Sequence, residues 1–106
     1  MQYFRTLDSW QDQGFTLVAD VTYETCHPAD LFDVADLADI LEGIDSGLYQ
    51  WLMLRVRVLD DQGECLIQNN LGGLLYVDPR DLLKDGTVES MAAECLAEVR
   101  NTTVSH

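Results

Sequence analysis

A row of carboxylates is the feature of this sequence with the clearest chemical potential. The acids recur at every third position, a set we call the acid ladder: Asp30, Asp33, Asp36, Asp39, Glu42 and Asp45. On an α-helix each step of three residues rises about 4.5 Å and turns by about −60°, so the carboxylates wind slowly around the axis. Neighbouring acids then lie about 5–6 Å apart at their Cβ atoms, where like charges destabilise the helix slightly. No lysine or arginine lies between residues 30 and 45 to offset this repulsion, so something tolerates or uses the row.

Three interpretations of the acid ladder are open. It is a solvated helix face whose first acids favour the positive end of the helix, or a row of charge that imitates a phosphate backbone and docks in a basic groove, or a metal site. Calcium requires several oxygen ligands that converge on one point, and the loop spacing of an EF-hand is absent. We therefore expect no metal and no cofactor. If the row has a function, the sequence predicts a basic protein or nucleoprotein complex as its partner.

A second candidate surface is one face of the segment 49–60, whose strict alternation predicts a strand. Tyr49, Trp51, Met53, Arg55 and Arg57 share this face, and aromatic residues, methionine and arginine are enriched in protein interfaces. The alternative hypothesis for function is therefore an accessory module that acts through Tyr49, Trp51, Arg55 and Arg57, with a homodimer as one version. A second interpretation is structural: the aromatic residues pack under the N-terminal segment and the arginines pair with nearby acids. A platform for single-stranded nucleic acid fits the residue types, but the charge of the chain opposes it.

Catalytic motifs are lacking. Cys26 precedes His27, but adjacent residues of an extended chain point to opposite sides, and no residue can be named that would orient the histidine. The segment Leu71-Gly72-Gly73-Leu74 is too short for a phosphate-binding loop and predicts a bulge instead. The three cysteines form no CxxC pair, which indicates neither a zinc site nor a redox motif and fits a reducing cytoplasm. We expect a protein that is not an enzyme.

The elements that position these residues follow from hydrophobic periodicity. The stretch 1–14 is compatible with a short helix or an edge strand, and residues 101–106 are expected to fray. Gly43 and Gly47 supply stops for the first long helix. The expected order is β-α-β-β-β-α: strand 15–24, helix 29–45, strand 49–60, strand 64–69, strand 74–77, a short helix that starts at Pro79, and an amphipathic helix 88–100. This order predicts a single α+β domain over residues 1–106, with a mainly antiparallel sheet of three or four strands and two or three helices packed on one face.

The length and the charge of the chain limit the classes of function that it can have. The chain has 106 residues and a formal net charge of −13, of which −9 falls within the first 48 residues. Such acidity argues against direct binding of the whole molecule to nucleic acid or to an anionic membrane. In size, charge and the acid ladder the chain resembles the small acidic proteins of phages and plasmids that block restriction or CRISPR machinery by imitating nucleic acid. That resemblance implies a non-catalytic inhibitor with a basic, nucleic-acid-processing partner.

Overall fold

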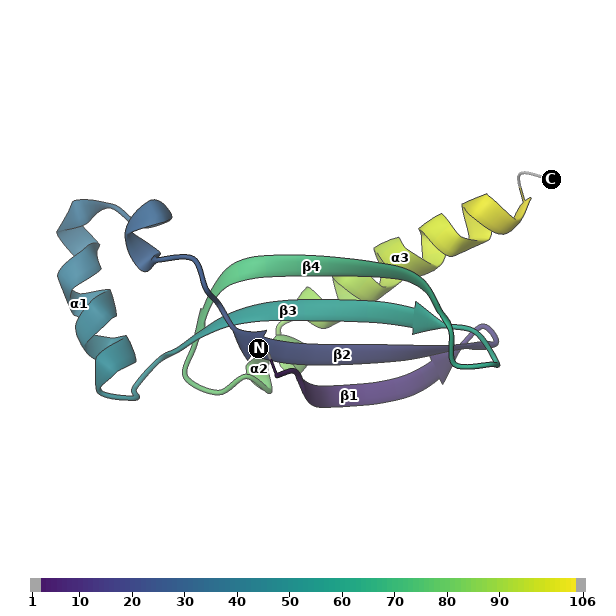
Figure 1. Ribbon diagram of the computed structural model, residues 1–106, viewed down its shortest axis with the longest axis horizontal. Coiled ribbons are helices and arrows are strands. Elements are labelled where there is room, and N and C mark those ends of the chain that lie inside the picture. The colour runs from purple at the N-terminus through teal and green to yellow at the C-terminus, as the bar shows by residue number, and fades with distance from the viewer. Residues whose placement is uncertain (1–2, 105–106) are drawn as a thin grey trace.

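One antiparallel sheet forms the centre of the molecule (Figure 1). The computed structural model describes residues 3–104, and its strands follow one another across the sheet in the order β1-β2-β3-β4. Their bounds are Arg5–Asp12 for β1, Phe15–Tyr23 for β2, Gln50–Leu59 for β3 and Cys65–Tyr76 for β4. Strands that neighbour in sequence also neighbour in space, so β1 and β4 are the two edges of the sheet.

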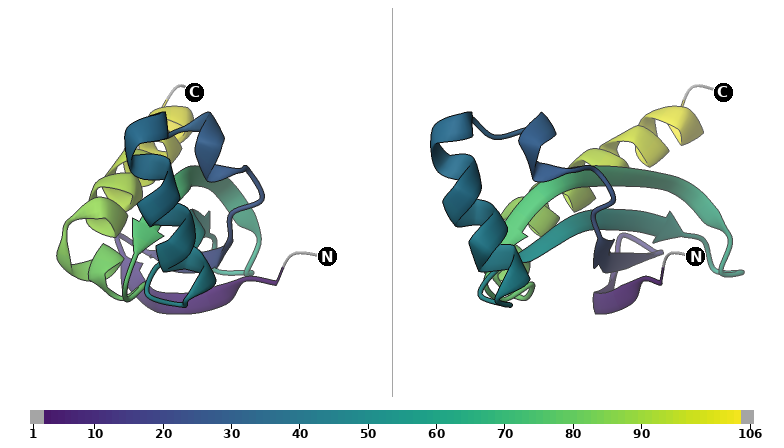
Figure 2. Two further views of the ribbon diagram at one scale, coloured as in Figure 1. Left: turned by 90° about the vertical axis from the view of Figure 1, so that its left-hand side faces the viewer. Right: turned by 60° about the vertical axis from the view of Figure 1, so that its left-hand side comes forward.

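The helices lie in two different places. A four-residue helix, α2 (Asp81–Lys84), leads into the long helix α3 (Thr87–Val104), which crosses one face of the sheet (Figure 1). A short 3-10 helix, η1 (Pro28–Asp30), and the helix α1 (Val34–Asp45) are inserted between β2 and β3. They stand beyond the end of the strands rather than on the face that α3 covers (Figure 2).

The core lies between the sheet and α3. Period-two alternation sends every second residue of β2 and β3 to this face, and α3 meets it with a stripe of helical spacing. The buried members are Leu17, Ala19, Val21, Leu54, Val56, Val58, Leu82, Val88, Met91, Ala92, Cys95, Leu96 and Val99. None of them belongs to α1, so the insertion adds nothing to the main core.

The expected fold class is confirmed, with differences in the element order. Residues 5–12 form an edge strand, because the turn at Gln13 and Gly14 takes up positive φ angles and folds β1 back onto β2. The two short strands expected over 64–69 and 74–77 are one strand, β4, with a shift of register opposite Leu52 and Leu54 where Gly73 has a φ of 71°. The order is therefore β-β-α-β-β-α-α.

The helix bounds also differ from those expected. The helix expected over 29–45 is split into η1 and α1, and the short helix begins at Asp81 rather than at Pro79. The last helix continues past residue 100 to Val104, while residues 105–106 lie outside the described part of the chain. Among the described residues, no helix combines the length and the apolar character that crossing a bilayer requires.

Candidate functional site

The acid ladder lies on a projecting part of the molecule, which we call the acidic arm (residues 24–49). Asp30 ends η1, Asp33 directly precedes α1, and the other four acids are within α1. All six side chains are exposed. Figure 1 shows α1 separated from the strands, and Figure 2 shows it crossing in front of the end of the sheet. The structure thus places the six predicted residues along the acidic arm, four of them within α1.

Aromatic packing holds the first connection of the arm to the sheet. The indole Nε1 of Trp51 donates a hydrogen bond to the backbone oxygen of Cys26 at 2.7 Å. The rings of Phe32 and Trp51 pack with their centroids 5.6 Å apart, and a side-chain methyl of Leu31 lies against Gly73 of β4. The segment between η1 and α1 is thereby fixed to the beginning of β3 and the bulge of β4.

Glu24 adds a polar attachment at the same place. Its Oε2 accepts a hydrogen bond from the backbone N–H of Gly73 at 3.0 Å, and its Oε1 accepts from the N–H groups of Thr25 and Cys26 at 3.1 Å each. A carboxylate that accepts three backbone N–H groups fixes the exit of the chain from β2. Glu24 therefore positions the arm and is not part of its exposed row of acids.

The second connection of the arm closes against a glycine. Gly43 is buried in α1, and a Cβ at this position would strike the ring of Tyr49. Tyr49 also donates its backbone N–H to the carbonyl oxygen of Gly43 at 3.0 Å. Gly47, with a φ of 83°, makes the left-handed turn that ends the helix. Tyr49 is thus half-buried against α1, and not under the N-terminal segment as the structural interpretation of the strand face expected.

The apolar stripe of α1 is covered only in part. Leu37, Ile40, Leu41 and Ile44 are half-buried and point the same way, because they recur at helical spacing. At about 100° per residue, Asp39 and Glu42 lie opposite this stripe. Asp36 and Asp45 lie near its two borders, and Asp33 directly precedes the helix. A flat partner can therefore meet about three acids at once, and a groove that wraps around the helix can meet more.

No compensating charge accompanies the acid ladder. The sequence has no lysine or arginine between Arg5 and Arg55. Within the described residues, the ion pairs join Arg55 and Arg57 to Asp20 and Arg80 to Asp78, and none involves an acid of the ladder. The negative charge of the arm is therefore available to an outside partner.

The two arginines of the second candidate surface belong to a network around Asp20, which is 1% exposed. Asp20 Oδ2 accepts hydrogen bonds from Arg55 Nη2 at 2.7 Å and from Arg57 Nη2 at 3.0 Å. Its Oδ1 accepts one from the hydroxyl of Thr6 at 3.1 Å, and the ring of Phe4 lies over the Arg55 guanidinium at 3.7 Å. This Asp20 network (Thr6, Asp20, Arg55, Arg57) ties β1, β2 and β3 together on the face that α3 does not cover.

Two features of the strand face become clear from this network. The interpretation that the arginines pair with a nearby acid is confirmed, with Asp20 as the acid and Phe4 of the N-terminal segment as a further contact. Trp51 packs on the ring of Phe32 and donates a hydrogen bond to the backbone oxygen of Cys26. Its side chain is therefore buried, and the residue is only 6% exposed. Sequence patterns did not single out Asp20, because the alternation of β2 places it with Thr16 and Thr22 on the face opposite the apolar one.

Cys26 and His27 do not form a nucleophile and base. Desolvation and the nearby carboxylates of Asp30 and Glu24 raise the pKa of the Cys26 thiol, which keeps it protonated near neutral pH. His27 uses its Nδ1 to accept the backbone N–H of Ala29 at 3.0 Å, so this ring caps η1. The pair therefore has a structural role at the base of the arm.

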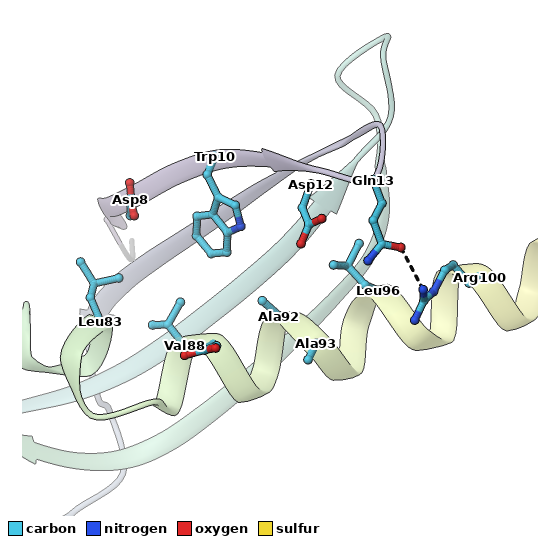
Figure 3. Close-up of a pocket in the computed structure, with 11 residues that line it drawn as sticks. Asp8, Trp10, Asp12, Gln13, Leu83, Val88, Ala92, Ala93, Leu96 and Arg100 are labelled. Atoms are coloured by element: carbon cyan, nitrogen blue, oxygen red, sulfur yellow. Dashed lines mark hydrogen bonds between the residues drawn. The ribbon is translucent and has the colours of Figure 1, made fainter.

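A groove of about 480 Å³ runs between β1 and α3 (Figure 3). Trp10 and Asp12 point from β1 toward α3, and Arg100 closes one end by donating a hydrogen bond to Gln13 at 3.0 Å. Its floor is apolar, with Val88, Ala92 and Leu96 of α3. Within residues 3–104 there is no group of three or more histidine, cysteine or acidic side chains placed to hold a metal ion. The groove offers apolar contact and carboxylates, without a nucleophile beside a base.

Comparison with known proteins adds no further assignment. No protein-family model, no curated protein and no solved structure matches this chain. Function therefore has to be inferred from the arm, the network and the groove themselves.

Proposed function

We propose that this chain is a non-catalytic binding protein whose acidic arm engages a basic surface on a protein or nucleoprotein complex, as a nucleic-acid mimic does. The observation that carries the proposal is the acid ladder on α1, exposed, outside the main core and without an ion pair among the described residues. A helix that only completed the fold would be expected to pack its apolar stripe on the sheet and to balance some of its charge.

The spacing of the acids supports a basic groove as the binding site. From Asp33 to Asp45 one carboxylate follows another about every 4.5 Å along the helix axis, comparable with the axial rise of roughly 3.4 Å per phosphate along one strand of a DNA duplex. Lysines and arginines placed to contact phosphates therefore find acids at comparable distances. Salt screens such contacts, because the Debye length is about 8 Å at physiological ionic strength.

The apolar stripe of α1 supports the same site. Leu37, Ile40, Leu41 and Ile44 keep part of their surface exposed, and removing apolar surface from water contributes about 25 cal/mol per Å². A groove that surrounds the arm would cover these side chains while its basic rim meets the acids. Apolar contact then supplies affinity that salt does not remove, and the charges supply orientation and speed of association.

Further expectations belong to the same proposal. The size, the charge and the acid ladder support the class of phage or plasmid inhibitors of restriction or CRISPR machinery. Three free cysteines support a reducing compartment such as the cytoplasm. Direct binding of this chain to nucleic acid or to a membrane is not part of the proposal.

The alternative, an accessory module acting through Tyr49, Trp51, Arg55 and Arg57, is the weaker proposal. Tyr49 packs on Gly43, Trp51 is buried, and both arginines are bound to Asp20. A partner on this face would have to compete with contacts that the fold already uses.

The proposal is tested with two variants of equal charge. Asp36→Asn, Asp39→Asn and Glu42→Gln together remove three carboxylates from the outer side of α1. Asp61→Asn, Glu64→Gln and Glu94→Gln remove three exposed carboxylates elsewhere. Each chain is immobilised, and proteins from the source cells that were first retained on a DNA column are passed over it.

The wild-type chain is expected to retain a protein at about 50 mM salt, to bind it more weakly at about 300 mM, and to release it when duplex DNA is added. At about 0.5 kcal/mol per exposed contact, the α1 variant should bind about tenfold more weakly, whereas the control variant should bind as the wild type does. Equal binding by the two variants, or binding that DNA does not compete, contradicts the proposal.

A further inference from the structure

The least charged part of the chain forms one edge of the sheet. Residues 65–77 carry no lysine, arginine, aspartate or glutamate, and these thirteen residues are the longest such run in the sequence. They comprise the whole of β4, which has β3 on one side and no strand on the other. In a chain with a net charge of −13, a neutral run of this length at an edge is unexpected.

The opposite edge is built differently. β1 carries Arg5, Asp8 and Asp12, and its pairing with β2 is interrupted by a register shift between Thr6 and Asp8. Charged side chains and bulges are the usual means by which an edge strand avoids pairing with another chain. β4 lacks the charges, and from Ile67 to Leu71 its pairing with β3 is regular.

The outer side of β4 is open to solvent. Every second residue of an edge strand directs both its N–H and its C=O away from the sheet, where they are free to pair with another strand. Residues 65, 66 and 68–72 are exposed, including Leu66 at 47% and Leu71 at 40%. An edge that has no strand on its outer side and no charged side chains fits a strand from a second chain.

We propose that two copies of this chain pair through β4 in antiparallel register, with the twofold axis at Asn69. This register sets Asn69 against Asn69 of the second copy, Gln68 against Asn70 and Ile67 against Leu71. The register with β3 shows that Ile67 and Leu71 share the face covered by α3, whereas Gln68 and Asn70 share the face of the Asp20 network. Apolar residues therefore meet apolar residues and amides meet amides, and the joined sheet has eight strands.

Electrostatics favours this edge over other surfaces for self-association. Two chains of charge −13 repel each other, so a contact between them has to lie where charge is lowest. α1 stands beyond the end of the sheet at which β4 finishes (Figure 1). Antiparallel pairing about Asn69 sends the two acidic arms to opposite ends of the joined sheet and keeps the strongest repulsion apart. The dimer does not depend on the proposed function of the arm.

The first test is the oligomeric state. Five paired residues make a small interface, so the dissociation constant is expected on the order of 10–100 µM. Sedimentation of the wild-type chain from about 5 to about 500 µM should show a monomer becoming a dimer, more so at about 0.5 M salt because salt screens the repulsion. Binding of a basic partner by the arm changes with salt in the opposite direction, so failure of one proposal is distinguishable from failure of the other.

The second test fixes the register. In a chain with Cys26→Ser and Cys65→Ser, the substitution Asn69→Cys brings two thiols together at the twofold axis. Cα atoms directly opposite in antiparallel strands lie about 4.5–5.5 Å apart, within the range that a disulfide spans. Mild oxidation should give a covalent dimer on a non-reducing gel, whereas Asn70→Cys, displaced from its copy by two residues, and Gln11→Cys on β1 should give at least about tenfold less.

Two control variants distinguish loss of the dimer from misfolding of the chain. Asn69→Glu should keep the circular dichroism spectrum and abolish the dimer by placing two carboxylates at the axis, while Gln11→Glu adds the same charge to β1 and should leave the dimer unchanged. Amide hydrogens of residues 66–72 in the unmodified chain should exchange more slowly at high protein concentration. A monomer throughout the concentration range, or equal crosslinking at positions 69, 70 and 11, overturns the proposal.

Discussion

The helices α1 and α3 have the same kind of sequence and opposite surroundings. Each shows apolar residues at helical spacing with acids on the other side. In α3 the stripe of six residues is buried in the core: Val88, Met91, Ala92, Cys95, Leu96 and Val99. In α1 the corresponding residues are only half-buried, and none belongs to that core. Periodicity therefore identifies an amphipathic helix but does not identify what covers its apolar side.

The start of each helix differs in the same sense. Asp85 accepts the backbone N–H of Thr87, the first residue of α3, at 3.0 Å and also accepts the hydroxyl of Tyr76. Asp33 stands before α1 and makes no side-chain capping bond. α3 is thus fixed to the sheet through Tyr76 of β4, whereas α1 begins with a free carboxylate.

The largest expected effect contrasts two aspartates. Asp20→Ala leaves Arg55 and Arg57 without their buried partner and should lower the free energy of unfolding by about 3–5 kcal/mol. Asp39→Ala removes an exposed acid from α1 and should change the free energy of unfolding by no more than a few tenths of a kcal/mol. The change should be a small gain, because repulsion between neighbouring acids is relieved. Urea denaturation measures both. A cost for Asp20→Ala below about 1 kcal/mol would mean that the network does not hold the sheet together.

The second contrast removes one leucine from each stripe. Leu96 is 4% exposed, and Leu96→Ala should cost about 2–5 kcal/mol through lost burial and the cavity left behind. Leu41→Ala in α1 should cost less, about 1–2 kcal/mol, because part of this side chain is already in water. Equal losses in urea denaturation would show that α1 packs as firmly as α3.

The third effect concerns the contact that closes the arm. Gly43→Ala should lower stability by about 1–2 kcal/mol, because the new methyl group strikes the ring of Tyr49. In a Tyr49→Ala background the same change should raise stability by up to about 1 kcal/mol, since alanine is the better helix former. A double-mutant cycle measures this reversal, and additive effects would show that the two residues do not touch.

The smallest effect is a pH dependence confined to α3. The Tyr76 hydroxyl and then the hydroxyl and N–H of Thr87 lower the pKa of Asp85 in the folded chain. Because the pKa is lower in the folded chain than in the unfolded chain, ionised Asp85 stabilises the fold at pH values above the usual pKa of a carboxyl group. This stabilisation is lost as the pH falls to the pKa that Asp85 has in the folded chain. Asp85→Ala should lower the free energy of unfolding by about 1 kcal/mol at neutral pH. The variant should also lose less stability than the wild type as the pH is lowered.

The matching substitution in α1 serves as the control. At neutral pH, Asp33→Ala should cost less stability than Asp85→Ala does, because Asp33 has no capping bond to lose. The hydrogen bond to Asp85 raises the pKa of Tyr76 in the folded chain. The folded chain therefore loses stability when the pH rises far enough to ionise tyrosine, and Tyr76→Phe should reduce this loss. Thermal melting between about pH 3 and pH 11, which spans both groups, checks these outcomes.

Most of the elements could be predicted from the sequence, because each pattern is local. Alternation predicts both ends of β2 and of β3 to within one residue. Helical spacing predicts all six buried residues of the α3 stripe. The Gly72-Gly73 pair was correctly expected to be a bulge but was taken to end one strand and begin another. β1 has weak alternation, and only its pairing with β2 shows that it is a strand.

The candidate site divides in the same way. The spacing of the acid ladder and the absence of lysine and arginine between residues 5 and 55 are properties of the sequence. Asp20 could not be joined to Arg55 and Arg57 from sequence, because they are 35 and 37 residues apart and meet only through the register of β2 and β3.

The fold class, the amphipathic helices, the position of the charge along the chain and the neutral run from 65 to 77 can all be derived from the amino-acid sequence. Three features require the folded chain: α1 stands off the end of the sheet, Trp51 is buried against Phe32, and the neutral run is an edge of the sheet. Periodicity shows which side of an element is apolar, but what lies against that side depends on contacts between residues far apart in the chain.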